Sequence, residues 1–101
     1  MDPAGIPALI EAVRHLHGAD AVHVETIAVH EQAPNGETVW RGDVETFALA
    51  GHATATRAYA WSEATTGTKR RFFVVLHTGP VTSAAKAVQA SILAARPSLQ
   101  G

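Results

Sequence analysis

The sequence predicts an α+β fold with the order α-β-β-β-β-α, and two observations support this prediction. Apolar residues recur at helical spacing near both ends of the chain. Between them lie segments rich in β-branched residues, which turn signals separate from one another. We expect a four-stranded antiparallel meander sheet with both helices packed on one face of it. At 101 residues the chain is expected to form a single domain, residues 1–101.

Local signals place each element in turn. The first helix is expected at about residues 7–17, because Pro7 suits a first turn and Gly18 suits the position after a helix end. Thr82 or Ser83 is expected to cap the second helix, at about residues 83–96. The last strand is apolar on both faces, so its register stays open. The four strands are expected at about residues 21–32, 37–49, 55–63 and 69–77.

The two faces of the predicted sheet differ in chemistry. If Gln32 pairs with Thr38 across the turn Pro34-Asn35-Gly36, even-numbered residues of the first two strands share one face. A hairpin turning near Gly51 keeps this parity in the third strand. The even face is expected to be the core beneath the helices, because it carries small residues that let helices approach: Gly42, Ala48, Ala58 and Ala60.

The odd-numbered face is therefore the expected contact surface. Aromatic and arginine side chains are typical of protein interfaces, and a symmetric dimer would bury them. We expect a non-enzymatic domain that forms a homodimer or binds a protein partner through this face. Phe47 and either Phe72 or Phe73 are expected to extend its aromatic part. The candidate contact residues are Glu25, Arg41, Asp43, Glu45, Arg57, Tyr59 and Trp61.

The same face supports a second hypothesis, a small-molecule-binding protein or an enzyme. The predicted register places Glu25 opposite Glu45 and beside Tyr59, and opposed carboxylates destabilise a sheet unless they share a proton, a cation or a basic ligand. The alternative is a solvated face on which Arg41 and Arg57 neutralise the acids. The sequence shows neither a nucleophile motif nor a phosphate-binding loop, so no catalytic residue and no cofactor are assigned.

Composition narrows the remaining classes. The six histidines lack a recognised ligand spacing, so we expect no metal site, and the loop residue His52 is the first histidine to mutate. The chain has no cysteine, which fits a reducing cytoplasm. The N-terminus lacks the basic and long apolar regions of a signal peptide, and no apolar run is long enough for a membrane span.

Nucleic-acid binding is the third hypothesis. Lys69, Arg70 and Arg71 form the one basic cluster of the sequence, which could contact phosphates. The net charge of −1 favours a protein interface over nucleic acid. A basic start to a very apolar strand also protects it from aggregation, which is the simpler interpretation of this cluster.

Two resemblances accompany these predictions. The segment TSAAKAVQASILA, Thr82 to Ala94, resembles the closing alanine-rich helix of double-stranded RNA-binding domains, and the helix–strands–helix order is similar to their topology. That resemblance implies duplex RNA binding, although Lys86 stands alone where the family has a lysine pair and one extra strand is predicted here. The block VWRGDVETFALAGHATATRAYAW, Val39 to Trp61, resembles segments of small uncharacterised bacterial proteins, which implies a bacterial source but no activity.

Overall fold

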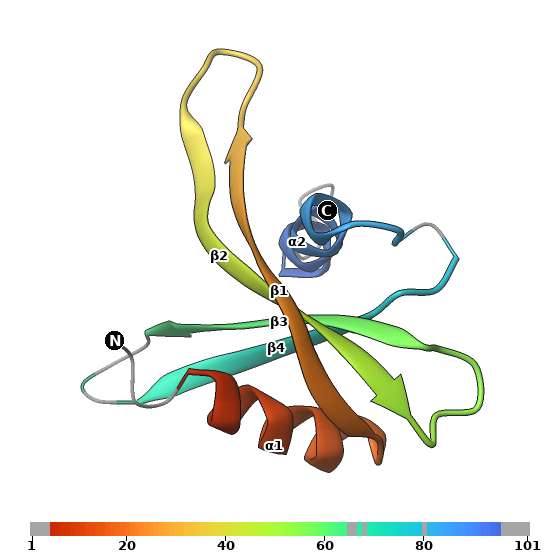
Figure 1. Cartoon of the computed structure of the whole chain (residues 1–101). Helices are drawn as coiled ribbons and strands as arrows, with labels where there is room; N and C mark the ends of the chain where they lie inside the picture. The colour runs from red at the N-terminus through yellow and green to blue at the C-terminus, as the bar shows by residue number, and fades with distance from the viewer. Residues whose placement is uncertain (1–4, 65–66, 68, 80, 96–101) are drawn as a thin grey trace.

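The computed structural model describes residues 5–64, 67, 69–79 and 81–95 and has the predicted α+β order, which is confirmed. Residues 65, 66 and 68, which lie between the expected third and fourth strands, and residue 96 of the expected second helix lie outside the described residues. The elements, shown in Figure 1, are α1 (Ile6–His17), β1 (Asp20–Gln32), β2 (Thr38–Ala50), β3 (Arg57–Ala64), β4 (Arg70–Leu76) and α2 (Ala84–Ala95).

The four strands form one antiparallel sheet in the order β1-β2-β3-β4, so β1 and β4 are its edges. β1 and β2 pair along almost their whole length. β2 pairs with β3 only from Glu45 to Ala48. The distal half of the β1–β2 hairpin therefore projects away from the other two strands, as Figure 1 shows.

Gly18 ends α1 and Ser83 caps the start of α2, as the sequence predicts. Gly18 closes α1 in the left-handed conformation, with φ of 65°, and its N–H donates to the Arg14 carbonyl. Of the two expected caps of α2, Ser83 is the one used, because its Oγ accepts a hydrogen bond from the Lys86 N–H. Neither described helix has the length and the apolar character that crossing a bilayer requires.

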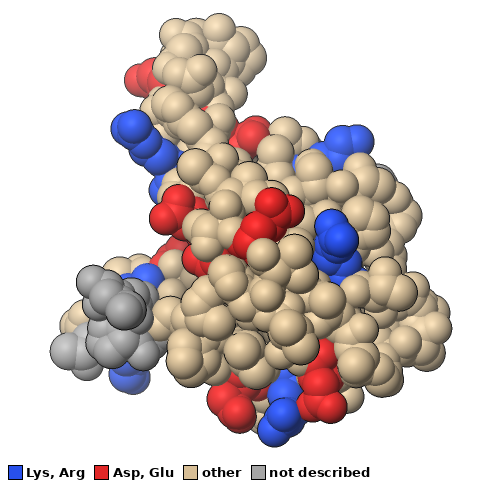
Figure 2. Space-filling view, in the orientation of Figure 1, with Lys and Arg blue, Asp and Glu red and all other residues tan. Residues whose placement is uncertain are grey.

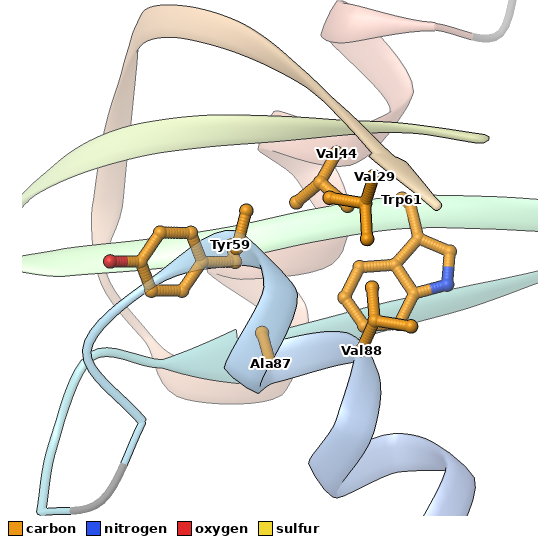
Figure 3. Close-up of a cluster of buried hydrophobic side chains, with 7 residues drawn as sticks. Val29, Val44, Tyr59, Trp61, Ala87 and Val88 are labelled. Carbon is orange, nitrogen blue, oxygen red and sulfur yellow. The ribbon is translucent and has the colours of Figure 1, made fainter. Parts of the chain in front are cut away.

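The two helices lie on opposite faces of the sheet, so the expectation that both cover one face is wrong. Leu9 and Val13 of α1 cluster with Phe47 and Ala60. Val88 of α2 clusters instead with strand residues that include Tyr59 and Trp61, and Figures 1 and 3 show α2 on that side. Successive residues of a strand point to opposite faces, so Ala60 and Trp61 define two separate layers. β3 is buried on both sides and needs a helix for each.

Register shifts explain why the predicted parity fails. The expected pair Gln32–Thr38 is present. The register shifts between Gln32 and Glu31 and again at Val24, so the β1 residues between these two points pair one position away from the prediction. Glu25 consequently pairs with Thr46 and not with Glu45. Even-numbered residues of β2 then pair with odd-numbered residues of β3, as Thr46 does with Tyr59. Each change of parity moves side chains to the other face.

The two-layer core predicts that two phenylalanines will differ sharply in their effect on stability. Phe47 is fully buried in the α1 layer, whereas Phe72 on the edge strand is 36% exposed. Phe47→Ala is expected to lower the free energy of unfolding by about 3–5 kcal/mol, through lost burial and a cavity. Phe72→Ala is expected to cost about 1 kcal/mol or less. Urea unfolding followed by circular dichroism measures both, and equal losses would contradict the assignment of Phe47 to the core.

Candidate functional site

The structure divides the predicted contact residues between the two faces of the sheet. Arg41, Asp43 and Glu45 share a face of β2 with Phe47, which is the side covered by α1. The other four predicted residues lie on the side of α2. Three of these four gather near one end of β3, namely Glu25, Arg57 and Tyr59, and the fourth, Trp61, lies further along the strand.

Trp61 belongs to the core and is not an open contact residue. Its ring is buried and stacks on Phe73, with 5.3 Å between ring centroids. Its indole N–H donates to Oε2 of Glu63 at 3.2 Å, and the indole of Trp40 donates to the same oxygen at 2.7 Å. The carboxylate thus ties β2 to β3 beneath α2. The expected aromatic patch is divided, because Phe47 lies in the opposite layer.

Tyr59 is also buried, but its hydroxyl reaches the end of the α2 layer. Figure 3 shows its ring against Ala87, with the hydroxyl directed away from Trp61. The hydroxyl lies 2.6 Å from Nδ1 of His77, a partner that sequence analysis did not identify. Burial raises the pKa of Tyr59; Arg57 acts in the opposite direction and Glu25 adds to the rise. The phenol is therefore a neutral, hydrogen-bonded anchor at neutral pH.

The sheet beside Tyr59 carries an exposed surface that we name the open patch, formed by Val22, Glu25, Ala48 and Arg57. Val22 pairs with Ala48, and Ala48 pairs in turn with Arg57, so the three share one face. Val22 is 67% exposed, although valine is usually buried. The bulge residue Val24, 47% exposed, lies beside it on the edge strand. None of the four belongs to the cluster that packs under α2.

The charged members of the open patch have no ion-pair partner among the described residues. Glu25 and Arg57 are both exposed, and neither takes part in a described salt bridge or side-chain hydrogen bond. Their strands, β1 and β3, are two strand spacings apart, or about 10 Å. The patch therefore presents an acid at one margin, a base at the other and an exposed valine on the edge strand.

A buried hydroxyl lies next to the open patch. Thr46 sits between Glu25 and Tyr59 in one cross-strand row, and it is fully buried. Its Oγ1 is buried and has no hydrogen-bond partner among the residues that the structure describes. The sequence gives no signal for Thr46 or His77 as neighbours of the candidate residues, because their positions depend on the bulge and on the register of β4.

The predicted pair of carboxylates does not form. Glu45 lies on the α1 side of the sheet, where its Oε1 is 2.7 Å from Nε2 of His23 and also accepts a hydrogen bond from Thr26. Glu25 faces the opposite side, paired with Thr46. The separation removes the proton-sharing or cation-sharing site on which the small-molecule hypothesis depended.

The two arginines of the basic cluster lie on opposite faces of β4. Arg70 donates to both the hydroxyl and the carbonyl oxygen of Ser62, on the α1 side of β4. Arg71 projects to the other side, with its guanidinium 5.2 Å from the centre of the Phe73 ring. Lys69 is exposed and precedes the strand. Figure 2 shows basic and acidic side chains interspersed over the visible face.

His52 has a structural role in the β2–β3 loop. Its Nδ1 accepts hydrogen bonds from the backbone N–H groups of Thr54 and Ala55, at 3.1 and 3.0 Å. The ring thereby satisfies two donors of a loop that lacks regular structure. Within the described part of the chain, no three histidine or carboxylate side chains are grouped so as to hold a metal ion.

Comparison with known proteins identified no match for this chain. No family model, no curated protein sequence and no solved structure matches the chain.

Tyr59 is the one tyrosine of the chain, so its ionisation can be measured without ambiguity. We expect the phenolate absorbance to rise with a midpoint above the ordinary pKa of 10.0, because burial disfavours the charged form. A raised pKa in the folded state contributes stability that is fully present below about pH 10 and is lost as the pH rises through the folded value. An ultraviolet titration of the native protein measures the midpoint, and a value at or below 10.0 would contradict the buried hydroxyl.

Proposed function

We propose that this chain is a non-enzymatic interaction domain that forms a symmetric homodimer through the open patch. The observation that carries the proposal is the unpaired Glu25 and Arg57 on either side of exposed apolar surface. A cytoplasmic location is part of the proposal, because a chain without cysteine needs no oxidising compartment to fold.

The charges of the patch suit a second copy of the same surface. In a twofold interface the same patch faces itself, so a residue at one margin meets the residue at the opposite margin of the partner. Glu25 of each copy would then approach Arg57 of the other, forming two ion pairs around Val22. Removing the exposed valines from water in both copies would add hydrophobic stabilisation, at roughly 25 cal/mol per Å².

The openness of the patch favours a protein partner over a small molecule. Small-molecule sites are concave and enclose most of their ligand. Here the central valine is two-thirds exposed and belongs to an edge strand. An apolar centre with charged margins is typical of protein interfaces. Tyr59 and His77 support this surface from the β3 and β4 side through their hydrogen bond.

A charge-swap experiment tests the homodimer. E25R and R57E are each expected to weaken dimerisation about tenfold or more, because each reversal turns two attractions into two repulsions. The double variant E25R/R57E restores opposite charges at both contacts, so its dimer affinity is expected to return to near the starting value. Sedimentation velocity over a concentration series measures all of these constants.

The matched control is R41E and D43R, which reverse exposed charges of β2 on the other side of the sheet. These variants are expected to leave the dimer unchanged. A wild-type chain that stays monomeric at every concentration, or a double variant no better than its two parents, would sink the proposal.

A further inference from the structure

The second edge of the sheet, β4, presents unpaired backbone groups in a known order. The N–H of His77 donates to the carbonyl of Arg57 at 2.9 Å, which makes this a hydrogen-bonded antiparallel pair. Hydrogen-bonded pairs alternate along the ladder, so the odd-numbered residues of β4 bond to β3. The N–H and C=O groups of Phe72 and Val74 consequently point outward. No strand lies beyond β4 in the described parts of the chain.

An apolar groove runs beside this edge, between β4 and α1. Its volume is about 610 Å³, and one wall is Phe72 of β4. The other wall is α1, whose Ala8, Ala12 and Leu16 form the apolar lining and whose Glu11 and His15 also line the groove. Leu16 is 54% exposed, and Phe72 is also among the exposed large apolar residues. The groove therefore exposes apolar surface that the domain's own core does not use.

The dimensions of the groove fit the side chains of one added strand. From Ala8 to Leu16 the helix rises about 12 Å. Alternate side chains of a strand lie about 6.6 Å apart on one face, so two or three of them fit along this length. The volume lies within the range of about 300–1,000 Å³ typical of pockets that hold a single small ligand. It suits a few side chains and is small for a second folded domain.

The positive charges beside β4 indicate which charge an added strand should carry. Arg70 and Arg71 are exposed at the start of the strand, and neither has a carboxylate partner among the described residues. Glu63 stands opposite Arg71 in the β3–β4 ladder, on the α2 side, whereas Arg70, on the side of the groove, bonds only the neutral Ser62. The positive charge of Arg70 is therefore the one left for an added strand. An acidic residue at the adjacent end of an added strand would supply the opposite charge.

We propose that the edge of β4 binds an extended peptide segment of another protein as a fifth strand. The outward N–H and C=O groups of β4 pair with the peptide backbone, and apolar side chains at alternate peptide positions enter the groove beside Leu16 and Phe72. The residue of the peptide next to Arg70 is acidic. This site is separate from the open patch, because the groove lies on the α1 side of the sheet and the open patch on the α2 side, and it does not depend on the homodimer.

An array of synthetic heptapeptides tests the proposal. Its members carry acidic residues at both ends and two or three valine, leucine or phenylalanine residues at alternate positions. We expect members of the array to bind with Kd of about 1 mM or tighter, and to shift the amide resonances of β4 and α1. N-methylation of alternate peptide nitrogens is expected to abolish binding by removing strand pairing, whereas methylation of the other nitrogens is tolerated.

Substitutions of the groove residues test whether the peptide binds at this site. F72E and L16E are each expected to weaken peptide binding at least tenfold, and the matched control L93E, at an exposed leucine of α2, is expected to leave it unchanged. Absence of binding throughout the array, or binding indifferent to F72E, would overturn the strand-addition site. Conversion of a wild-type dimer to monomer by F72E would also overturn it, because β4 would then be the self-association edge. The E25R variant, whose dimer is expected to be weakened, is expected to bind peptide normally, so the two proposals can fail independently.

Discussion

The double-sided burial of β3 is the constraint on which the rest of the structure depends. Ala58, Tyr59, Ala60 and Trp61 are consecutive and all buried, so the strand must be covered on both faces. The alanine side lets α1 approach closely, and the aromatic side packs against alanines and Val88 of α2. One helix packs on each face, and among the described residues no further strand pairs with the outer backbone edge of β1 or of β4. The β1 edge, the β4 edge and the projecting hairpin stay accessible.

Polar contacts at both ends of the aromatic layer hold β3 in this position. At one end, Glu63 accepts hydrogen bonds from the indoles of Trp40 and Trp61. At the other end, Tyr59 bonds His77, whose backbone N–H bonds the carbonyl of Arg57. A buried hydrogen bond that is satisfied stabilises its surroundings and fixes side-chain orientation. Arg57 therefore extends from a backbone that is held in place, which suits a residue in a contact surface.

The sequence predicts the class and order of the elements well, because these depend on local periodicity and turn chemistry. Pro7, Gly18 and Ser83 mark helix ends, and the pair Gln32–Thr38 fixes the first hairpin turn. The prediction fails on which face Glu25 and Glu45 occupy, since the register shift between Glu31 and Gln32 changes the parity of the pairing and has no residue signature. The prediction also places both helices on one face of the sheet. The alternation of alanine and aromatic residues in β3 does not by itself indicate that both faces of this strand are buried.

The shifted register of β1 brings Val22 and Glu25 onto the same face of the sheet as Arg57, and we propose that this surface is self-complementary. An isotope-filtered NOE experiment on a mixed sample of labelled and unlabelled protein tests the proposed dimer, because it detects contacts between copies only. We expect intermolecular NOEs from the Val22 methyl groups to protons of the Arg57 region. Intermolecular NOEs confined to Leu16 and Phe72, or none at concentrations where the protein is dimeric, would contradict this proposal.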